Sequence, residues 1–197
     1  MTPPKRPVRK ITLDIETTGE FGPNNDVLAL DLAIACIHDS ATGEYSSFTQ
    51  EELPRLWPIL ESADLLIGYN SDHFDIPILN KYYSGDLTHI RSIDLLKEVR
   101  AVLGRRLRMD NIAEATLGKK KSGNGAQAVK WWNEGRFDEV RAYCIDDVRI
   151  TLELYDYVRA HGSLRYTDYD GVREIKIRAA DWEKPQDAGA LTHTLPF

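Results

Sequence analysis

Residues 11–19 read ITLDIETTG and place two carboxylates, Asp14 and Glu16, in a segment that otherwise has the pattern of a buried β-strand. Side chains alternate across a strand, so the three aliphatic residues share one face, whereas Asp14 and Glu16 lie side by side on the other. Two like charges about 4 Å apart repel by about 4 kcal/mol at an effective dielectric constant of 20. The stretch therefore indicates either a strand end that reaches solvent or a cation held between the two acids.

The length of 197 residues predicts one domain, residues 1–197, with a single large core. The longest apolar run, residues 27–37, is short and is interrupted by Asp31, so no membrane partner is expected. The basic N-terminus is followed by no apolar segment of signal-peptide type, and Cys36 and Cys144 both lie in apolar stretches. These features predict a cytoplasmic protein without a disulfide framework.

The net charge of −6 is unevenly distributed along the chain. Residues 91–130 hold ten basic and four acidic residues, a net charge of +6, so the rest of the chain carries −12. A basic region beside an acidic one suits an enzyme that binds phosphates in one place and cations in another. Basic residues scattered over a solvated helical surface give the same count, so both interpretations stay open.

The order of the predicted elements is that of an α/β protein. Strands are predicted at residues 9–16, 26–39, 44–49 and 64–70, and the short link DSATGE between the second and third favours an antiparallel meander. Helices are predicted at residues 49–63, 74–83, 94–103, 109–117, 125–134 and 137–160. An Asp-Gly hairpin turn is predicted in the segment 168–178, and from about residue 184 the chain has the composition of a polar tail. This order predicts a mixed sheet flanked by helices.

A second acidic stretch, IGYNSDHFDIPIL, leaves the predicted strand through Gly68 and Asn70 and enters a helix. Asp75 lies in the first turn of that helix, near the positive end of the helix dipole. An acid at this position is also ordinary capping chemistry, so Asp75 alone does not indicate a site.

The third stretch, VRAYCIDDVRITLELYDYV, predicts a long helix with one apolar stripe. The stripe consists of Val140, Cys144, Val148, Leu152 and Tyr155. Tyr143 and Asp147 are four residues apart and therefore lie on one face beside the stripe, whereas Asp146 points elsewhere. An aromatic residue at the edge of the core explains Tyr143 equally well.

Taken together, LDIETTG, NSDHFD and YCIDD occur in the order and spacing of the DEDD exonucleases of the RNase H-like superfamily. Over about residues 9–160 the chain resembles this family, and most of all the small stand-alone relatives of the proofreading domains of family B DNA polymerases. The resemblance implies an RNase H-like fold whose mixed sheet combines a three-stranded antiparallel meander with parallel strands, plus a C-terminal hairpin extension at residues 161–197.

The resemblance also implies the site residues. The matching acids are Asp14 and Glu16 in the first motif, Asp75 in the second and Asp147 in the third. Tyr143, four residues before Asp147, matches the tyrosine subtype, because the histidine subtype has its histidine at the position of Ala142.

In such a site the expected cofactors are two divalent metal ions, Mg²⁺ or Mn²⁺, which oxygen ligands without Cys or His suit. By resemblance, Asp14 bridges both ions, Glu16 and Asp147 hold the ion that carries the attacking water, and Asp75 supports the second. Tyr143 orients the water, because a phenol with a pKa of about 10 is a poor base at pH 7.

Five residues near the acids are expected to contact the substrate. Thr17, Thr18 and Gly19 are expected beside the terminal nucleotide, and Asn70 and Phe74 beside the penultimate one. Lys119, Lys120 and Lys121 stand in a glycine-rich loop that is either a phosphate cradle or plainly solvated. Trp131 and Trp132 are candidates for base stacking, although at least one is expected in the core.

The sequence thus predicts a metal-dependent 3′–5′ exonuclease that releases nucleoside 5′-monophosphates from single-stranded nucleic acid by a two-metal mechanism. The 3′–5′ direction comes from the resemblance. The alternatives are a non-catalytic nucleic-acid binding module and a structure-specific endonuclease on the same fold. DNA and RNA both remain candidate substrates, a helicase or polymerase is a candidate partner, and the oligomeric state is left open.

Overall fold

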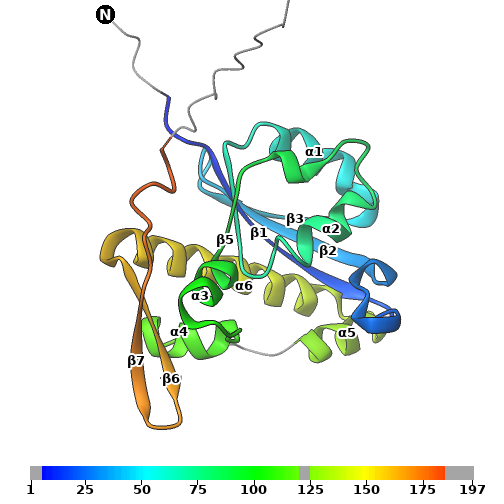
Figure 1. The fold of residues 1–197 in the computed structure, drawn as a ribbon. Helices are drawn as coiled ribbons and strands as arrows, with labels where there is room; N and C mark the ends of the chain where they lie inside the picture. The colour runs from blue at the N-terminus through cyan, green and yellow to red at the C-terminus, as the bar shows by residue number, and fades with distance from the viewer. Residues whose placement is uncertain (1–5, 120–124, 185–197) are drawn as a thin grey trace, which may run out of the picture.

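β1 (Lys10–Thr18) is the central strand of a five-stranded mixed sheet with the order β3-β2-β1-β4-β5 (Figure 1). The computed structural model describes residues 6–119 and 125–184. The other strands are β2 (Asp31–Asp39), β3 (Glu44–Thr49), β4 (Leu65–Gly68) and β5 (Ser92–Asp94). β1, β2 and β3 form an antiparallel meander, and β4 and β5 continue the sheet in parallel with β1. The predicted combination of a meander with parallel strands is confirmed.

Helices and a hairpin complete the described part of the chain. The α-helices are α1 (Leu53–Glu61), α2 (Asp75–Asn80), α3 (Leu95–Leu103), α4 (Met109–Leu117), α5 (Gly125–Asn133) and α6 (Phe137–His161). Short 3₁₀ turns are η1 (Pro23–Asn25), η2 (Val27–Ala29), η3 (Gln50–Glu52) and η4 (Leu87–His89). The predicted C-terminal hairpin is confirmed as β6 (Ser163–Asp168) and β7 (Gly171–Lys176), which pair antiparallel.

Two predicted elements in the first half of the chain differ from the structure. The strand predicted at 26–39 begins only at Asp31, because Asp26 accepts a hydrogen bond from Leu28 N–H and starts the turn η2 instead. The helix predicted at 49–63 starts as η3, with a capping box between Thr49 and Glu52, before α1 begins. In both cases an acidic side chain accepts a hydrogen bond from a nearby backbone N–H group, and this local turn replaces the regular element that the apolar pattern predicts.

The sheet has a helix layer on each face (Figure 1). α1 and α2 cover the face to which β1 contributes Ile11, Leu13 and Ile15, and these side chains form one core cluster with the apolar residues of both helices. α6 packs across β1 and β2 on the opposite face. The alternation predicted for residues 11–16 is therefore realised, and the face with Asp14 and Glu16 is turned toward α6.

The apolar stripe of α6 differs in part from the prediction. Val140, Cys144, Val148 and Tyr155 are buried, but Leu152 is only half-buried. The buried positions of the second half are Ile150, Thr151, Leu154, Tyr155 and Val158. A helix with 3.6 residues per turn drifts relative to a fixed spacing of four, so the buried stripe moves around a helix of 25 residues.

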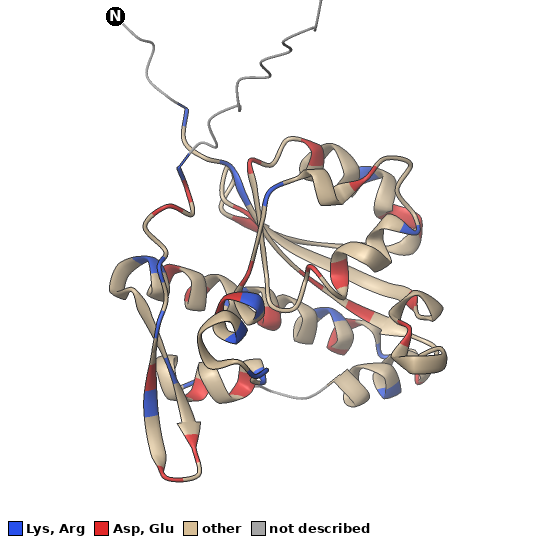
Figure 2. Cartoon of the chain, in the orientation of Figure 1, with Lys and Arg blue, Asp and Glu red and all other residues tan. Residues whose placement is uncertain are grey.

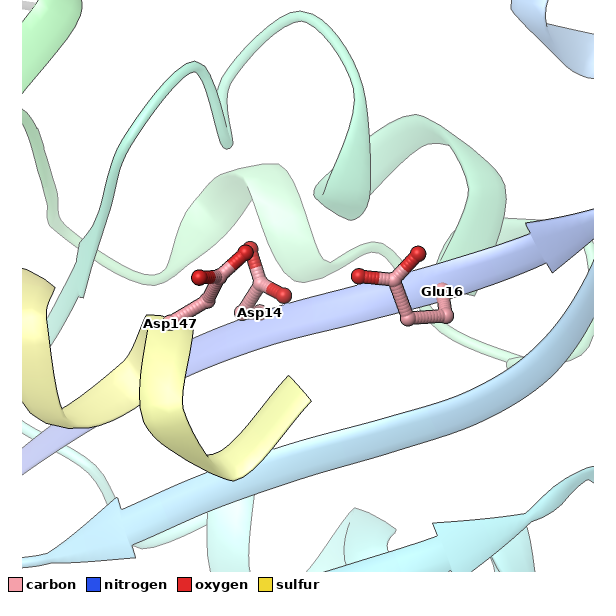
Figure 3. A group of neighbouring side chains, drawn as sticks. All are labelled: Asp14, Glu16 and Asp147. Atoms are coloured by element: carbon pink, nitrogen blue, oxygen red, sulfur yellow. The ribbon is translucent and has the colours of Figure 1, made fainter. Parts of the chain in front are cut away.

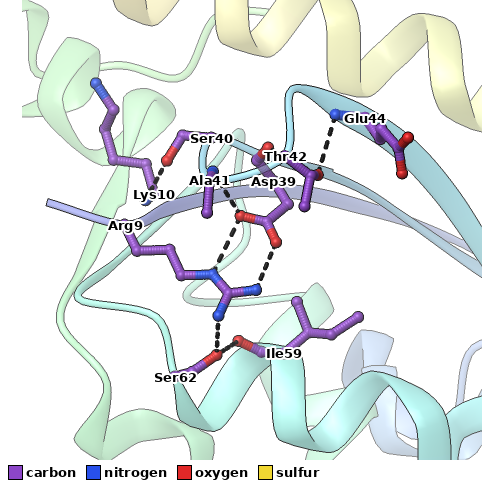
Figure 4. Close-up of polar contacts among 9 residues, drawn as sticks. All are labelled: Arg9, Lys10, Asp39, Ser40, Ala41, Thr42, Glu44, Ile59 and Ser62. Atoms are coloured by element: carbon purple, nitrogen blue, oxygen red, sulfur yellow. Dashed lines mark hydrogen bonds and ion pairs between the residues drawn. The ribbon is translucent and has the colours of Figure 1, made fainter. Parts of the chain in front are cut away.

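Arg9 ties the start of β1 to two neighbouring elements (Figure 4). Its guanidinium donates to both carboxylate oxygens of Asp39 at the end of β2 and, over 2.6 Å, to Ser62 Oγ after α1. Asp39 also accepts the N–H of Ala41 and so shapes the turn into β3. The hydrogen bond from Arg9 holds the pKa of Asp39 below its ordinary value.

The segment after the hairpin returns to the helix layer. The ring of Trp182 stacks on Tyr155 of α6 with centroids 5.4 Å apart. Glu183 accepts hydrogen bonds from Tyr155 Oη and from Lys10 Nζ at the start of β1. These contacts fasten the C-terminal extension to the core. Within residues 6–119 and 125–184 no helix combines the length and the apolar character needed to span a membrane.

Candidate metal centre

Three carboxylates converge where α6 crosses β1. Asp14 and Glu16 extend from β1 and Asp147 from α6, and one oxygen of each lies within 4.8 Å of the other two (Figure 3). Glu16 and Asp147 are buried, and Asp14 is half-buried. Three negative charges at this distance and burial repel strongly unless a cation compensates them. The donor set consists of hard oxygen atoms, which is the chemistry of a Mg²⁺ or Mn²⁺ site.

The surroundings of the triad fix its geometry from both sides. Asp14 pairs across the sheet with Cys36, and the thiol of Cys144 on α6 lies 3.4 Å from the carbonyl oxygen of Asp14. Both cysteines are buried and not disulfide-bonded, and burial raises the pKa of the Cys144 thiol. A register shift between Glu16 and Thr17 interrupts the regular pairing with β2 immediately after the acids, and Thr17 and Thr18 then pair with Leu32 and Asp31. Rigid secondary structure therefore aims all three carboxylates at one point.

Asp75 reaches the same region from α2 but is not part of the group within 4.8 Å among the described residues. Its side chain accepts a hydrogen bond of 3.0 Å from Ile15 N–H, the amide between the two acids of β1. β4 pairs with β1 only as far as Thr12, so Asp75 occupies the edge of β1 beyond the end of β4. Burial, aided by the charges of Asp94 and Asp147, raises the pKa of Asp75 to about 7.

The loop between β4 and α2 is held by Asp94, a residue whose role the sequence did not reveal. Its carboxylate accepts the N–H groups of Asn70, over 2.7 Å, and of Asp72, over 3.2 Å. The same carboxylate caps α3 through Leu96 N–H, so one buried acid organises both segments. An acid directly before a predicted helix is a signal for a cap, but nothing local to it indicates the loop that it also holds.

Gly68 and Asn70 give this loop its path. A Cβ atom at Gly68 would lie 2.2 Å from the hydroxyl oxygen of Ser71, so only glycine fits there. Asn70 has a φ of 71°, in the left-handed region that asparagine tolerates better than most residues. The strand exit predicted at these two residues is confirmed, and it brings Asp75 to the edge of β1.

Tyr143 is buried one turn before Asp147 on α6. Its ring lies edge-on to Trp131 of α5, with centroids 6.3 Å apart, beside an open hollow of about 580 Å³. Trp132 packs in the same manner on Phe137. Both tryptophans are half-buried against the small core cluster of β2 and α6, which agrees with the expectation that at least one belongs to the core.

The predicted nucleotide-binding residues Thr17, Thr18, Gly19, Asn70 and Phe74, here called the rim of the triad, belong to the two segments that also carry Glu16 and Asp75. Thr17, Thr18 and Gly19 continue β1 directly beyond Glu16, and Gly19 has a φ of 85°. Phe74 is half-buried, and its ring centroid is 6.4 Å from that of Phe21, which is 56% exposed. Phe21 was missed from the sequence, where the only signal is an aromatic residue in a polar, glycine-rich loop after the acids.

The lysine loop is only partly described. Lys119 forms an ion pair with Glu153 on α6, so its charge is compensated within the protein. Lys120 and Lys121 lie outside the described residues, and the predicted phosphate cradle stays a prediction.

Residues 11–159 match the family model of the RNase H superfamily, and the chain belongs to that superfamily. The expected RNase H-like fold is thereby confirmed. Among solved structures, the family B DNA polymerase from the hyperthermophilic archaeon Pyrobaculum calidifontis is similar, with a TM-score of 0.61 and 20% sequence identity. The similarity covers 78% of this chain and 25% of the polymerase chain. No curated protein is significantly similar in sequence.

Proposed function

We propose that this protein is a metal-dependent 3′–5′ exonuclease that releases nucleoside 5′-monophosphates from single-stranded nucleic acid. The observation that carries the proposal is the convergence of Asp14, Glu16 and Asp147 within 4.8 Å on an RNase H superfamily fold. Asp75, buried against the β1 backbone between the two acids of the strand, supplies a fourth carboxylate at the border of the triad. The similarity to a family B DNA polymerase supports nucleic acid as the partner.

In the proposed site Asp14, Glu16, Asp147 and Asp75 would hold two divalent ions. When bound, the ions supply charge neutralisation and an activated water for in-line displacement at a phosphodiester. Tyr143, one helical turn from Asp147, orients that water through its phenolic oxygen. Water orientation suits it better than proton abstraction, because the ordinary pKa of a tyrosine is about 10.

The protonation state of Asp75 makes metal binding depend on pH. With a pKa raised to about 7 in the metal-free protein, its carboxyl is largely protonated below that pH. A carboxyl group must be deprotonated to act as a metal ligand, so metal binding releases this proton. The proposal therefore predicts that the metal affinity rises with pH up to and beyond 7.

The rim of the triad gives the terminal nucleotides a place to bind. The backbone of Thr17, Thr18 and Gly19 continues directly from Glu16, so a nucleotide seated there has its phosphate beside the acids. Phe21 and Phe74 form an aromatic pair next to this backbone, and aromatic faces stack on bases of any sequence. In this arrangement Asn70 is near the penultimate nucleotide.

Hydrolysis of a labelled single-stranded oligonucleotide with Mn²⁺ tests the proposal. Asp14→Asn is expected to reduce the rate of hydrolysis by more than about 100-fold. Mutation of residues that only hydrogen-bond to metal ligands already lowers metal affinity or activity by about 10–100-fold. Asp146→Asn is the matched control, since it removes the same charge from a surface position of α6 that pairs with Arg149. A wild-type rate in the Asp14 variant would contradict the proposed function.

A further inference from the structure

A hollow of about 340 Å³ lies beside the loop that leads to Asp75, between this loop and α3. It is lined by Asn70, Asp72, His73, Asp94, Leu96, Lys97, Arg100 and Arg106. Lys97 and Arg100, which line it, belong to α3. The basic positions of α3 are blue in Figure 2. The hollow is separate from the acidic triad, and it shares Asn70 with the rim where the terminal nucleotides are proposed to bind.

The charges around this hollow are compensated unequally. The carboxylate of Asp94 is buried and accepts several backbone N–H groups, so it contributes little negative charge to the surface. Asp72 pairs with Lys97 over 2.9 Å. Arg100 is exposed and forms no ion pair with any residue in the described part of the chain. Arg106, also exposed, donates to the neutral amide oxygen of Asn70 over 2.7 Å.

The two arginines differ in this respect from most other described basic residues of the segment 91–130. Arg91 forms no ion pair among the described residues either, but its guanidinium donates to the backbone carbonyls of Asp181 and Lys184, and it does not line the hollow. Ion pairs within the described residues compensate Lys97, Arg105, Arg108, Lys119 and Lys130. Arg106 also lines a second hollow of about 330 Å³ toward the start of α4, so it stands between two concave surfaces. Of the described basic residues of this segment that form no ion pair, Arg100 and Arg106 are thus the two that line the hollow, next to Asn70.

We propose that this cationic hollow binds the phosphodiester groups of the substrate strand on the 5′ side of the nucleotides held at the metal site. The inference rests on the proposed exonuclease function and extends it. A guanidinium group matches the geometry of phosphate oxygens and pairs with two of them at once. A strand that leaves the triad past Asn70 meets Arg106 first and Arg100 next, because Arg106 is bonded to Asn70.

A scan with neutral linkages tests this assignment. Oligonucleotides carry one methylphosphonate in turn at the second to the sixth linkage from the 3′ end, and kcat/KM for removal of the 3′ nucleotide is measured. In the wild type, one or two of these positions should reduce kcat/KM about tenfold, as expected for the loss of a charge-assisted hydrogen bond. Arg100→Gln, alone and with Arg106→Gln, should raise KM on the unmodified strand, leave kcat unchanged, and abolish the penalty at those linkages.

Arg105→Gln is the matched control. Arg105 is exposed like its neighbour, but it pairs with Asp168 and does not line the hollow. This variant should show the wild-type pattern of interference. The single Arg100 variant guards against an indirect effect, because only Arg106 is bonded to the loop residue Asn70.

The outcomes separate this inference from the proposed function. Normal hydrolysis with no position-specific interference, or equal interference in wild type and variants, would overturn the inference and leave the exonuclease intact. A third outcome is that the methylphosphonates have no position-specific effect but the released 5′-mononucleotide inhibits the double variant less than the wild type. The hollow would then bind the product, and the inference would again be overturned. If the wild type does not hydrolyse the strands, fluorescence anisotropy with the same oligonucleotides tests the inference through binding affinity. One or two methylphosphonate positions must then weaken binding to the wild type but not to the double variant.

Discussion

Replacing Asp75 with Asn removes one buried carboxyl group from the acidic site and keeps an oxygen that can accept the hydrogen bond from Ile15 N–H. The side chain is 4% exposed, and burial raises the pKa of Asp75 to about 7, against an ordinary value of about 3.9. The raised pKa means that the folded state favours the protonated carboxyl of Asp75. The resulting stabilisation of the fold is complete below pH ~4 and is lost as the pH rises through about 7.

The expected magnitude follows from the size of this shift. Each pKa unit corresponds to about 1.4 kcal/mol, so the ionised group destabilises the metal-free fold by up to about 4 kcal/mol, of which about 3 kcal/mol develops between pH 5 and pH 8. The Asn variant lacks this loss. Its free energy of unfolding relative to the wild type should therefore increase by about 3 kcal/mol over the same range.

Urea unfolding in EDTA at pH 5 and pH 8 measures the difference in free energy of unfolding between the two proteins, in which the contributions of groups distant from Asp75 cancel. Asp146→Asn, a surface variant on α6, should show no such pH dependence. Addition of Mn²⁺ at pH 8 should stabilise the wild type more than the Asn variant, since only the wild type keeps all four carboxylates. A difference between wild type and Asp75→Asn that stays constant from pH 5 to pH 8 would refute the reasoning.

Four further substitutions test other features of the site and the fold. Tyr143→Phe should lower kcat but leave the metal-induced rise in Tm intact, whereas Asp147→Asn should lose both; unchanged kcat in the Phe variant would remove Tyr143 from the mechanism. Asp94→Ala should destabilise the fold by about 2–4 kcal/mol in urea unfolding and also slow hydrolysis, because several backbone N–H groups lose their acceptor. Asp39→Asn should lower the free energy of unfolding by about 1–3 kcal/mol at pH 7 but have no effect at low pH. Arg9 lowers the pKa of Asp39, so the stabilisation from the ionised carboxylate is lost as the pH falls through that pKa. An equal loss of stability at low pH would contradict this role of the Arg9–Asp39 pair.

Strict local periodicity made the centre of the site predictable. In residues 11–16 the alternation of a strand separates Asp14 and Glu16 from the aliphatic face, and in α6 a spacing of four residues places Tyr143 beside Asp147. Both patterns are properties of a single element, so the sequence contains them. The convergence of β1 with α6 required the family resemblance, because it depends on how distant elements pack.

The features that were missed depend on contacts between distant segments. β5 has only three residues and too little pattern to be recognised, although it completes the sheet. Asp94 looks like an ordinary helix cap, and its second role appears only when the loop at Asn70 folds against it. Arg100 and Arg106 are two of ten basic residues between 91 and 130. They stand out only through the contacts of the other described ones, which are ion pairs in most cases and backbone carbonyls for Arg91.

The central claim is that the acidic site removes nucleotides from a free 3′ end, and one gel tests it most directly. Single strands of DNA and of RNA, labelled at the 5′ end and carrying either a free 3′-hydroxyl or a blocked 3′ end, are incubated with the protein and Mg²⁺ or Mn²⁺. The account predicts a descending ladder from the free ends, little change in the blocked strands and a nucleoside 5′-monophosphate product. Discrete internal fragments from both kinds of strand, or strands that are retarded but intact with either metal, would contradict it.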